Sequence, residues 1–574
     1  MMMRRRKIRI CLIVVVGLGL ALIWSGEEPG PTIEEGSTLV LEVGGAYVEA
    51  NQSPWLARLL GEGSPPFLNL LSLFALAERD SRLDRVVVVI RPLAIGWGKV
   101  GELREAIDRL EAAGHETVAY LDMAAFRGSR EYFLASAADE VWVVPAGSVP
   151  VLGLAAEYYY LGGLWEKVGV EFDVAKAGRY KSAVEVYTAT GMSGPSREMA
   201  NSLLDSTNDF FLSGIAQARG LSVAELRAAI DQGPVLPTEL EALGLIDGVE
   251  HLGALLDGYS GGRVRQEAYA EVKPSEVGFE PVAQVALIYG TGTVVSGDRQ
   301  RSRGGDSFFA ARSTARSLAR AAADPAIDAI ILRIDSPGGS ALAAEEIWRS
   351  IGEARKEGKP IVASFSDVAA SGGYYVAVAA DEIVSNDATL TGSIGVFSLR
   401  PVISGGLEKL GIHFETLSRG RYADFMLSSQ PLSEAAQGKM QDMVVQVYDL
   451  FLSRVAEGRD LEVGDVDKIA QGRVWTGSQA YEIGLVDHLG GLHTAMARVG
   501  SLLGLESDAD IGLVMFPPPR SLSEEFADAL NARLAGIVQA QLPLPGALHG
   551  MVKWLAELPT QAPLAVPPYL VEIN

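Results

Sequence analysis

A serine directly before two glycines, in "ASGGYY", is the stretch of this sequence that most directly suggests covalent chemistry. Ser371, Gly372 and Gly373 precede an alanine-rich run with helical spacing. A serine at a strand-to-helix turn is exposed, and the amide that follows it can stabilise an oxyanion. Gly373 is expected to keep the substrate approach open. The alternative is that Ser371 only caps the helix N-terminus.

A second glycine turn, "RIDSPGGSALAAEEI", precedes the serine motif and could supply another oxyanion donor. The pattern predicts a strand that ends at Asp335 and a helix that begins near Leu342. Gly338 and Gly339 lie between them, and their unobstructed amides can donate to developing negative charge. Strand-to-helix turns also use glycine for structural reasons alone. This motif therefore supports an oxyanion site only in combination with the serine motif. Asp335 is expected to serve the loop.

The chain contains an internal duplication, which shows how these motifs are positioned. Four blocks in the first half resemble four in the second, and the offset between them falls only from 244 to 240 residues. Such a nearly constant offset indicates two copies of one domain. The paired blocks are 83–121 with 327–365, 130–142 with 372–384, 177–185 with 419–427, and 240–252 with 480–492.

Each copy alternates short apolar strands with amphipathic helices, which predicts βαβ units and a mainly parallel sheet. The 574-residue length fits two such domains. The predicted organisation is a basic tail with a membrane anchor (1–30), an N-terminal repeat (38–259), a linker (260–282), a C-terminal repeat (283–515) and a C-terminal extension (516–574).

The N-terminus predicts export. A basic cluster precedes an apolar run from Ile10 to Trp24 that is followed by no clear cleavage site. This pattern favours an uncleaved signal anchor, with the basic tail in the cytoplasm and the remainder outside the cytoplasmic membrane, in the periplasm if the cell is Gram-negative. A cleaved signal peptide is the alternative, and it leads to the same compartment.

Composition excludes several classes of function. The net charge of −23 argues against a nucleic-acid partner. Cys11 is the only cysteine, and the six histidines have no metal-ligand spacing. A thiolate metal cluster and zinc chemistry are therefore not expected. No cofactor is predicted.

The motifs "IDSPGG", "ASGGYY" and "TGSIG", with "GRYKSA" in the first half, together resemble signal peptide peptidase A in its long, duplicated, membrane-anchored form. That family belongs to the Clp protease and crotonase superfamily. The resemblance implies a serine endopeptidase in which Ser371 is the nucleophile and Lys181 the general base. It further implies that Ser393 orients the lysine, and that the amides of Gly339 and Gly372 form the oxyanion hole.

The resemblance also implies the partners: cleaved signal-peptide remnants and other small membrane-associated peptides as substrates, and a ring-like homotetramer. Lysine is a poor base at neutral pH unless burial lowers its pKa, and the alanine-rich surroundings could do this. Two alternatives remain open: an acyl-CoA enzyme of the crotonase type and a catalytically inactive scaffold.

The two repeats have lost complementary parts of the motif set. Ser129 aligns with Ser371, but it is followed by Arg130 and Glu131 instead of two glycines. In the C-terminal repeat, Ala423 occupies the position that aligns with Lys181. These losses predict a single active site per chain, at the interface of the two halves.

Overall fold

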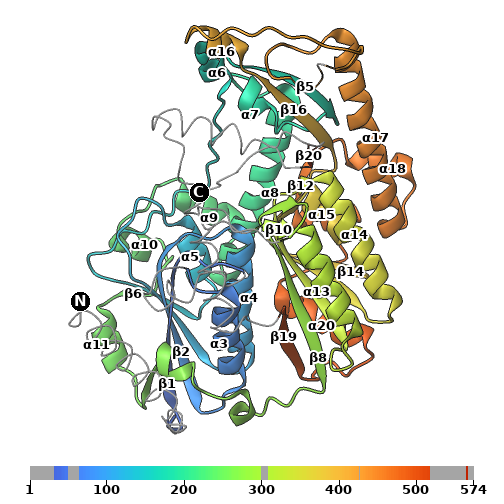
Figure 1. Cartoon of the computed structure of the whole chain (residues 1–574). Coiled ribbons are helices and arrows are strands. Elements are labelled where there is room, and N and C mark those ends of the chain that lie inside the picture. Colours follow the sequence, from blue (N-terminus) through green and yellow to red (C-terminus); the bar gives the residue numbers. More distant parts are fainter. Residues whose placement is uncertain are drawn as a thin grey trace, which may run out of the picture.

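The computed structural model of the chain describes residues 32–49, 64–298, 308–423, 425, 427–517 and 564–565 (Figure 1). The expected N-terminal anchor lies outside these residues, as does most of the C-terminal extension. Within the described ranges, no helix combines the length and the apolar character needed to cross a membrane.

The first repeat is built on a six-stranded sheet whose neighbouring strands are all parallel, in the order β7–β1–β2–β3–β4–β6. Runs of β-branched residues form its centre, and Val86 to Ile90 are fully buried. The strands are β1 (Ser37–Gly45), β2 (Leu83–Leu93), β3 (Glu116–Leu121), β4 (Glu140–Val143), β6 (Gly248–Val249) and β7 (Arg263–Arg265).

The second repeat has the same strand order, β19–β8–β11–β13–β14–β18, as the duplication predicts. Beyond these, β15 pairs in parallel with the C-terminal end of β13 and antiparallel with β17. The strands are β8 (Ala283–Thr291), β11 (Ala329–Ser336), β13 (Ile361–Ala370), β14 (Glu382–Ser385), β15 (Leu390–Gly392), β17 (Val474–Thr476), β18 (His488–Leu489) and β19 (Ile511–Phe516).

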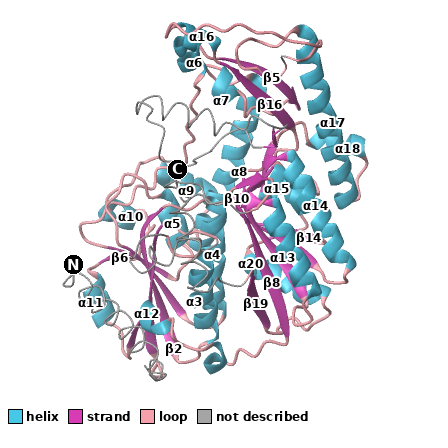
Figure 2. Cartoon of the chain, in the orientation of Figure 1, coloured by secondary structure: helices cyan, strands magenta, loops and turns pink. Residues whose placement is uncertain are grey.

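Helices cover both sheets, and α4 of the first repeat lies against the second sheet (Figure 2). At Gly98 in α4, an added Cβ would lie 2.6 Å from the carbonyl oxygen of Ser366 in β13, so only glycine permits this contact. The helices of the first half are α3 (Phe67–Arg79), α4 (Trp97–Ala112), α5 (Ser129–Ala135), α6 (Gly162–Val168), α7 (Glu185–Thr188), α8 (Gly194–Ala218), α9 (Val223–Ile230), α10 (Pro237–Ala242), α11 (Leu252–Asp257), α12 (Gln266–Tyr269) and the 3₁₀ helix η1 (Pro274–Val277). Those of the second half are α13 (Ala311–Ala323), α14 (Ala341–Lys356), α15 (Gly372–Ala377), α16 (Ser404–Glu408), α17 (Glu434–Arg459), α18 (Val463–Ile469), α19 (Gly477–Glu482) and α20 (Leu492–Leu502).

A third sheet combines strands from both repeats, in the order β10–β9–β12–β20–β16–β5. Figure 1 shows β5 beside β16 at the top of the molecule. The two strands are antiparallel, with Ala177 opposite Val396 and Glu171 opposite Val402. The bounds are β5 (Glu171–Ala177), β9 (Thr293–Val295), β10 (Phe308–Ala310), β12 (Gly339–Ser340), β16 (Val396–Val402) and β20 (Leu564–Ala565).

The β5–β16 pair carries a chain segment of the first repeat into the second half. Arg400 in β16 forms an ion pair with Asp173 in β5 at 2.5 Å, and both side chains are largely buried. The two repeats are therefore not separate in space, because residues 171–177 pair with the half to which they do not belong in sequence.

The segment 260–282, which the sequence suggested as a linker, is partly built into the fold. Its residues Arg263–Arg265 form β7 and pair in parallel with β1 at the edge of the first sheet. The polar composition of the segment reflects the exposed arginines at both ends of β7, while Val264 between them is buried. The link between the sheets is therefore shorter than the composition indicated.

Candidate active site

Ser371 lies at the turn between β13 and α15 in a backbone conformation that is rare for residues other than glycine, with φ 54° and ψ −115°. Its N–H donates to the carbonyl of Gly392 at 2.7 Å, and its own carbonyl accepts from the N–H of Tyr375 at 2.8 Å. The side chain makes no capping hydrogen bond to α15. The interpretation of Ser371 as a helix cap is therefore wrong, and its hydroxyl is directed elsewhere.

The hydroxyl of Ser371 meets the amine of Lys181, although the two residues are 190 positions apart. Lys181 Nζ lies 2.8 Å from Ser371 Oγ and 2.9 Å from both Oγ and the carbonyl oxygen of Ser393. All three side chains are completely buried, so the expectation that Ser371 is exposed was wrong. The structure thus brings together three of the five residues that the motifs singled out.

Burial lowers the pKa of the Lys181 amine well below its ordinary value, because the charged form loses its hydration. A neutral amine can accept a proton from a serine hydroxyl at hydrogen-bond distance. The pair therefore has both the geometry and the electrostatics of a nucleophile with its general base.

The β5–β16 pair places the lysine. Ala177 ends β5 opposite Val396, which begins β16, so the chain leaving β5 meets the chain entering β16. Lys181 comes shortly after the C-terminal end of β5, and Ser393 comes shortly before the N-terminal end of β16. Ser393 also has a positive φ of 52°, and its N–H donates to the carbonyl of Arg473 at 2.7 Å.

The glycine turn before α14 is held tightly against β9. A Cβ on Gly339 would lie 2.3 Å from the carbonyl oxygen of Val294, and Gly338 has a φ of 97°. The N–H of Val294 donates to the carbonyl of Gly338 at 2.8 Å. Gly372, the other expected oxyanion donor, begins α15, where amides have no acceptor within the helix.

Gly373 has a packing role that its motif did not suggest. A Cβ at this position would lie 2.9 Å from the carbonyl oxygen of Ser336 and 3.4 Å from its Cβ. The missing side chain therefore lets α15 pack against the turn that follows β11. The expectation that Gly373 also keeps the substrate approach open stays a prediction.

Sequence reasoning missed the segment "AQGRV", which supports the lysine and Ser393. The carbonyl of Gln471 accepts from the N–H of Tyr180 at 2.7 Å. A Cβ on Gly472 would lie 2.6 Å from the backbone nitrogen of Lys181. The isolated glycine between polar residues was the available signal, but nothing in the sequence showed which segment it would contact.

The position in the first repeat that corresponds to the site lacks its chemistry. The hydroxyl of Ser129 donates to the carbonyl of Gly153 at 2.9 Å. Both residues border a cavity of about 570 Å³. Ala423, which aligns with Lys181, lies on the surface. In the described part of the chain, no group of three or more His, Cys, Asp or Glu side chains could hold a metal ion.

The sequence also resembles known proteins over nearly its whole length. The sequence model of peptidase family S49 matches residues 111–257 and 353–506, one segment in each repeat. The chain is 32% identical to "Serine protease SPPA, chloroplastic" of Arabidopsis thaliana, over 89% of this chain and 75% of that protein. It is 30% identical to "Protease 4" of Haemophilus influenzae, over 96% of this chain and 92% of that protein.

Among solved structures, a mutant of the "1510-N membrane-bound stomatin-specific protease" is 14% identical and superposes with a TM-score of 0.26, over 42% of this chain and 99% of that one. The duplicated family match and the relatives that span nearly the whole chain identify it as a member of peptidase family S49, and thus as a serine peptidase.

Proposed function

We propose that the chain hydrolyses peptide bonds with Ser371 as the nucleophile and Lys181 as the general base. The observation that carries this proposal is the 2.8 Å contact between a completely buried lysine amine and the serine hydroxyl. Ser371 Oγ attacks the peptide carbonyl carbon while Lys181 Nζ takes the hydroxyl proton. The resulting oxyanion accepts hydrogen bonds from the amides of Gly339 and Gly372.

The same lysine completes the reaction. Protonated Lys181 donates its proton to the leaving amine, the C–N bond breaks, and an acyl-enzyme remains on Ser371. Water then attacks the ester, transferring its proton through Lys181, and releases the acid product. Ser393 holds the amine through two contacts, so that its lone pair faces Ser371 Oγ in each step.

The substrate is proposed to bind as an extended strand in the gap between β12 and β16. The chain's own Leu564–Ala565 forms β20 there, antiparallel to Gly339–Ser340 on one side and opposite Phe397 on the other. This pairing supports the idea that the gap accepts an extended backbone, as in recognition by strand addition. Remnants of cleaved signal peptides and other small membrane-associated peptides are the proposed substrates.

Labelling with a fluorophosphonate probe tests the proposed nucleophile and base together. We expect labelling of Ser371 whose rate rises with pH through a single ionisation below the ordinary lysine range, because only the neutral amine accepts a proton. Mass spectrometry of the labelled peptide, with Ser371→Ala as control, gives the site. An unlabelled Ser371 in folded protein would favour a scaffold or an acyl-CoA enzyme instead.

The basic cluster and the apolar run from Ile10 to Trp24 support a single-pass anchor in the cytoplasmic membrane, with both repeats outside. A chain that starts at Ser25 is expected to be soluble and to retain its peptidase activity, because the site is built wholly from later residues. Fractionation and peptide assays of both forms measure this. A folded but inactive truncated chain would mean that the segment does more than tether.

We also propose a homotetrameric ring; the duplication supports the ring, and the number of four subunits is the one that the family resemblance implies. At the 242-residue offset that aligns Ser129 with Ser371, the equivalent of β16 is 154–160 and that of β5 is 413–419. Neither of these two segments is a strand in the described chain, and all of 413–419 is exposed. If 413–419 of one copy paired with 154–160 of the next, each contact between copies would reproduce the β5–β16 pair. Repetition of this contact can close a ring.

Disrupting this edge should reduce the oligomer to single chains. Phe414 is 45% exposed and Leu417 is 91% exposed. The double variant Phe414→Asp/Leu417→Asp is expected to fold but to elute as a monomer, measured by light scattering coupled to size exclusion. Leu236→Asp, at another exposed leucine, should leave the tetramer intact. A double variant that stays tetrameric would place the interface elsewhere.

A further inference from the structure

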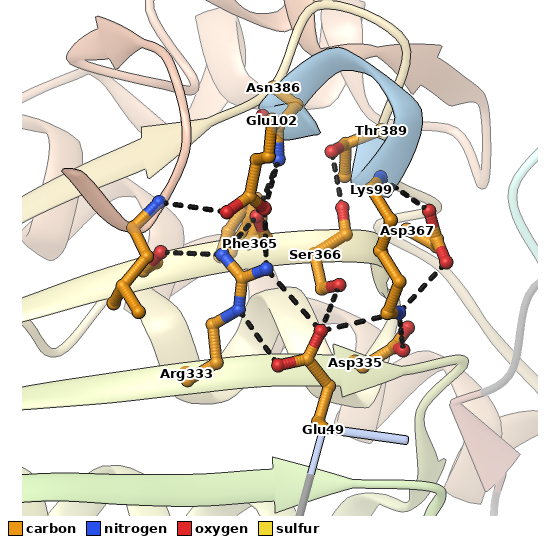
Figure 3. Close-up of polar contacts among 12 residues, drawn as sticks. Glu49, Lys99, Glu102, Arg333, Asp335, Phe365, Ser366, Asp367, Asn386 and Thr389 are labelled. Atoms are coloured by element: carbon orange, nitrogen blue, oxygen red, sulfur yellow. Dashed lines mark hydrogen bonds and ion pairs between the residues drawn. The ribbon is translucent and has the colours of Figure 1, made fainter. Parts of the chain in front are cut away.

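A network of charged side chains, buried at its centre and half-buried at the two aspartates, joins the two repeats, and Lys99 lies within it (Figure 3). Its Nζ lies 2.7 Å from Asp335 Oδ2, 2.8 Å from Asp367 Oδ2 and 3.2 Å from Glu49 Oε1. The lysine side chain is only 3% exposed. Lys99 belongs to α4 of the first repeat, whereas both aspartates belong to the second. One ammonium group therefore ties the two halves together.

The two aspartates lie on the strands that lead to the proposed nucleophile and oxyanion donors. Asp335 is the next-to-last residue of β11, directly before the glycine turn. Asp367 lies in β13, the strand that leads to Ser371. Ile334 pairs with Phe365, but Ser336 pairs with Ala369, so β13 contains extra residues at this point. Such bulges redirect the strand that follows them.

The network fixes this bulge from both sides. Asp335 Oδ1 accepts from the N–H of Val368 at 3.2 Å. The carboxylate of Asp367 accepts from the N–H of Gly96 at 3.0 Å and from that of Lys99 at 2.9 Å. Asp367 thus binds the N-terminus of α4, a helix of the other repeat. The position of β13 near Ser371 therefore depends on contacts with the first repeat.

The charges of the network make Lys99 hard to replace. Arg333 lies between Glu49 and Glu102, which leaves Lys99 as the cation between Asp335 and Asp367. The pKa of Asp335 is raised, chiefly by burial. Lys99 opposes this shift, while the nearby carboxylates of Asp367 and Glu49 add to it. Without the ammonium group, Asp335 and Asp367 would repel one another unless one of them bound a proton.

We infer that Lys99 is a positioning residue of the peptidase: by holding Asp335 and Asp367 together, it sets the glycine turn at Gly339 relative to Ser371. This inference rests on the proposed roles of Ser371 and Gly339. Lys99 itself touches neither the nucleophile nor the base among the contacts described above. It acts through the ends of β11 and β13.

Steady-state kinetics of the full chain against a peptide substrate test this role. Lys99→Met should lower kcat by about 10²-fold with KM little changed, because small displacements of reacting groups have effects of this size. The ratio of the variant's kcat to the wild-type kcat should rise as the pH falls, because protonated Asp335 can donate to Asp367. Dividing by the wild-type kcat cancels the pH dependence that comes from Lys181, because both proteins contain this lysine.

Further variants separate positioning from general destabilisation. Lys99→Arg should retain much of the activity. The double variant Lys99→Met/Asp335→Asn should have a higher kcat than Lys99→Met, because the new amide can donate a hydrogen bond to Asp367. Lys359→Met is the matched control, since that lysine binds the carbonyls of Ala321 and Asp324 elsewhere in the second repeat, and it should leave kcat unchanged. If Lys99→Met does not fold, Lys99→Gln replaces it with the same readouts.

The outcomes are distinct. Wild-type kcat in folded Lys99→Met, or a loss that is independent of pH and is not relieved in the double variant, would overturn the positioning role alone. Activity that persists in folded Ser371→Ala would refute the proposed function, and the inference about Lys99 with it.

Discussion

Replacing Lys181 with methionine should abolish peptidase activity as thoroughly as replacing Ser371 with alanine. Each change is expected to lower kcat/KM by at least about 10⁴-fold, because nucleophile and base act as a unit and neither works without the other. The methionine side chain has nearly the volume of lysine and suits the fully buried position, so folding should be retained. Peptide hydrolysis by the purified variants, with their circular dichroism spectra, gives the result.

Ser129→Ala provides the matched control for this experiment. Ser129 aligns with Ser371, but within the described part of the chain its hydroxyl binds only the carbonyl of Gly153, and the aligned partner of Lys181 is alanine. Its kcat/KM should therefore be nearly unchanged. Activity that survives in folded Lys181→Met, or disappears in folded Ser129→Ala, would contradict a single site shared between the repeats.

Adding one methyl group at Gly339 should cause the next largest loss of activity. In Gly339→Ala the new Cβ would lie 2.3 Å from the carbonyl oxygen of Val294, so the turn must move away from β9. The amide that is proposed to bind the oxyanion moves with it. Loss of one such donor lowers kcat by about 10²- to 10³-fold. We expect a loss of this size in kcat, measured by steady-state kinetics.

Gly352→Ala is the control for the added methyl group. Gly352 lies in α14, the helix that follows the turn, and no atom lies within 4 Å of the position that its Cβ would take. That variant should keep full activity and gain up to about 1 kcal/mol of stability from its better helix propensity. Equal kcat values for the two variants would remove Gly339 from the oxyanion site.

Much of this fold could be predicted from the sequence because the duplication repeats its signals. The runs "VVVVI" and "AIILRI" both became central strands, and the order of the strands is the same in both sheets. The glycine and serine motifs indicated where the chain turns sharply. Local backbone requirements are encoded in a few neighbouring residues, so they can be seen without knowledge of the tertiary structure.

Contacts between distant segments could not be predicted in the same way. Nothing near Lys99 in the sequence indicates that its amine meets two aspartates of the other repeat. Asp335 was assigned to its loop alone because its partner lies 236 residues away. The packing role of Gly373 was missed for the same reason: the residue that it approaches, Ser336, is contributed by another strand. These features depend on tertiary packing, which local patterns do not encode.

The pairing of β5 with β16 has a consequence for how the enzyme responds to dilution. Both strands belong to one chain, so the amine and the hydroxyl are brought together by folding and not by an encounter between molecules. Their effective concentration is set by the fold and is independent of the amount of protein present. Dilution of the protein therefore cannot separate Lys181 from Ser371. In an ancestor with serine and lysine on separate subunits, every active site would have been lost on dissociation.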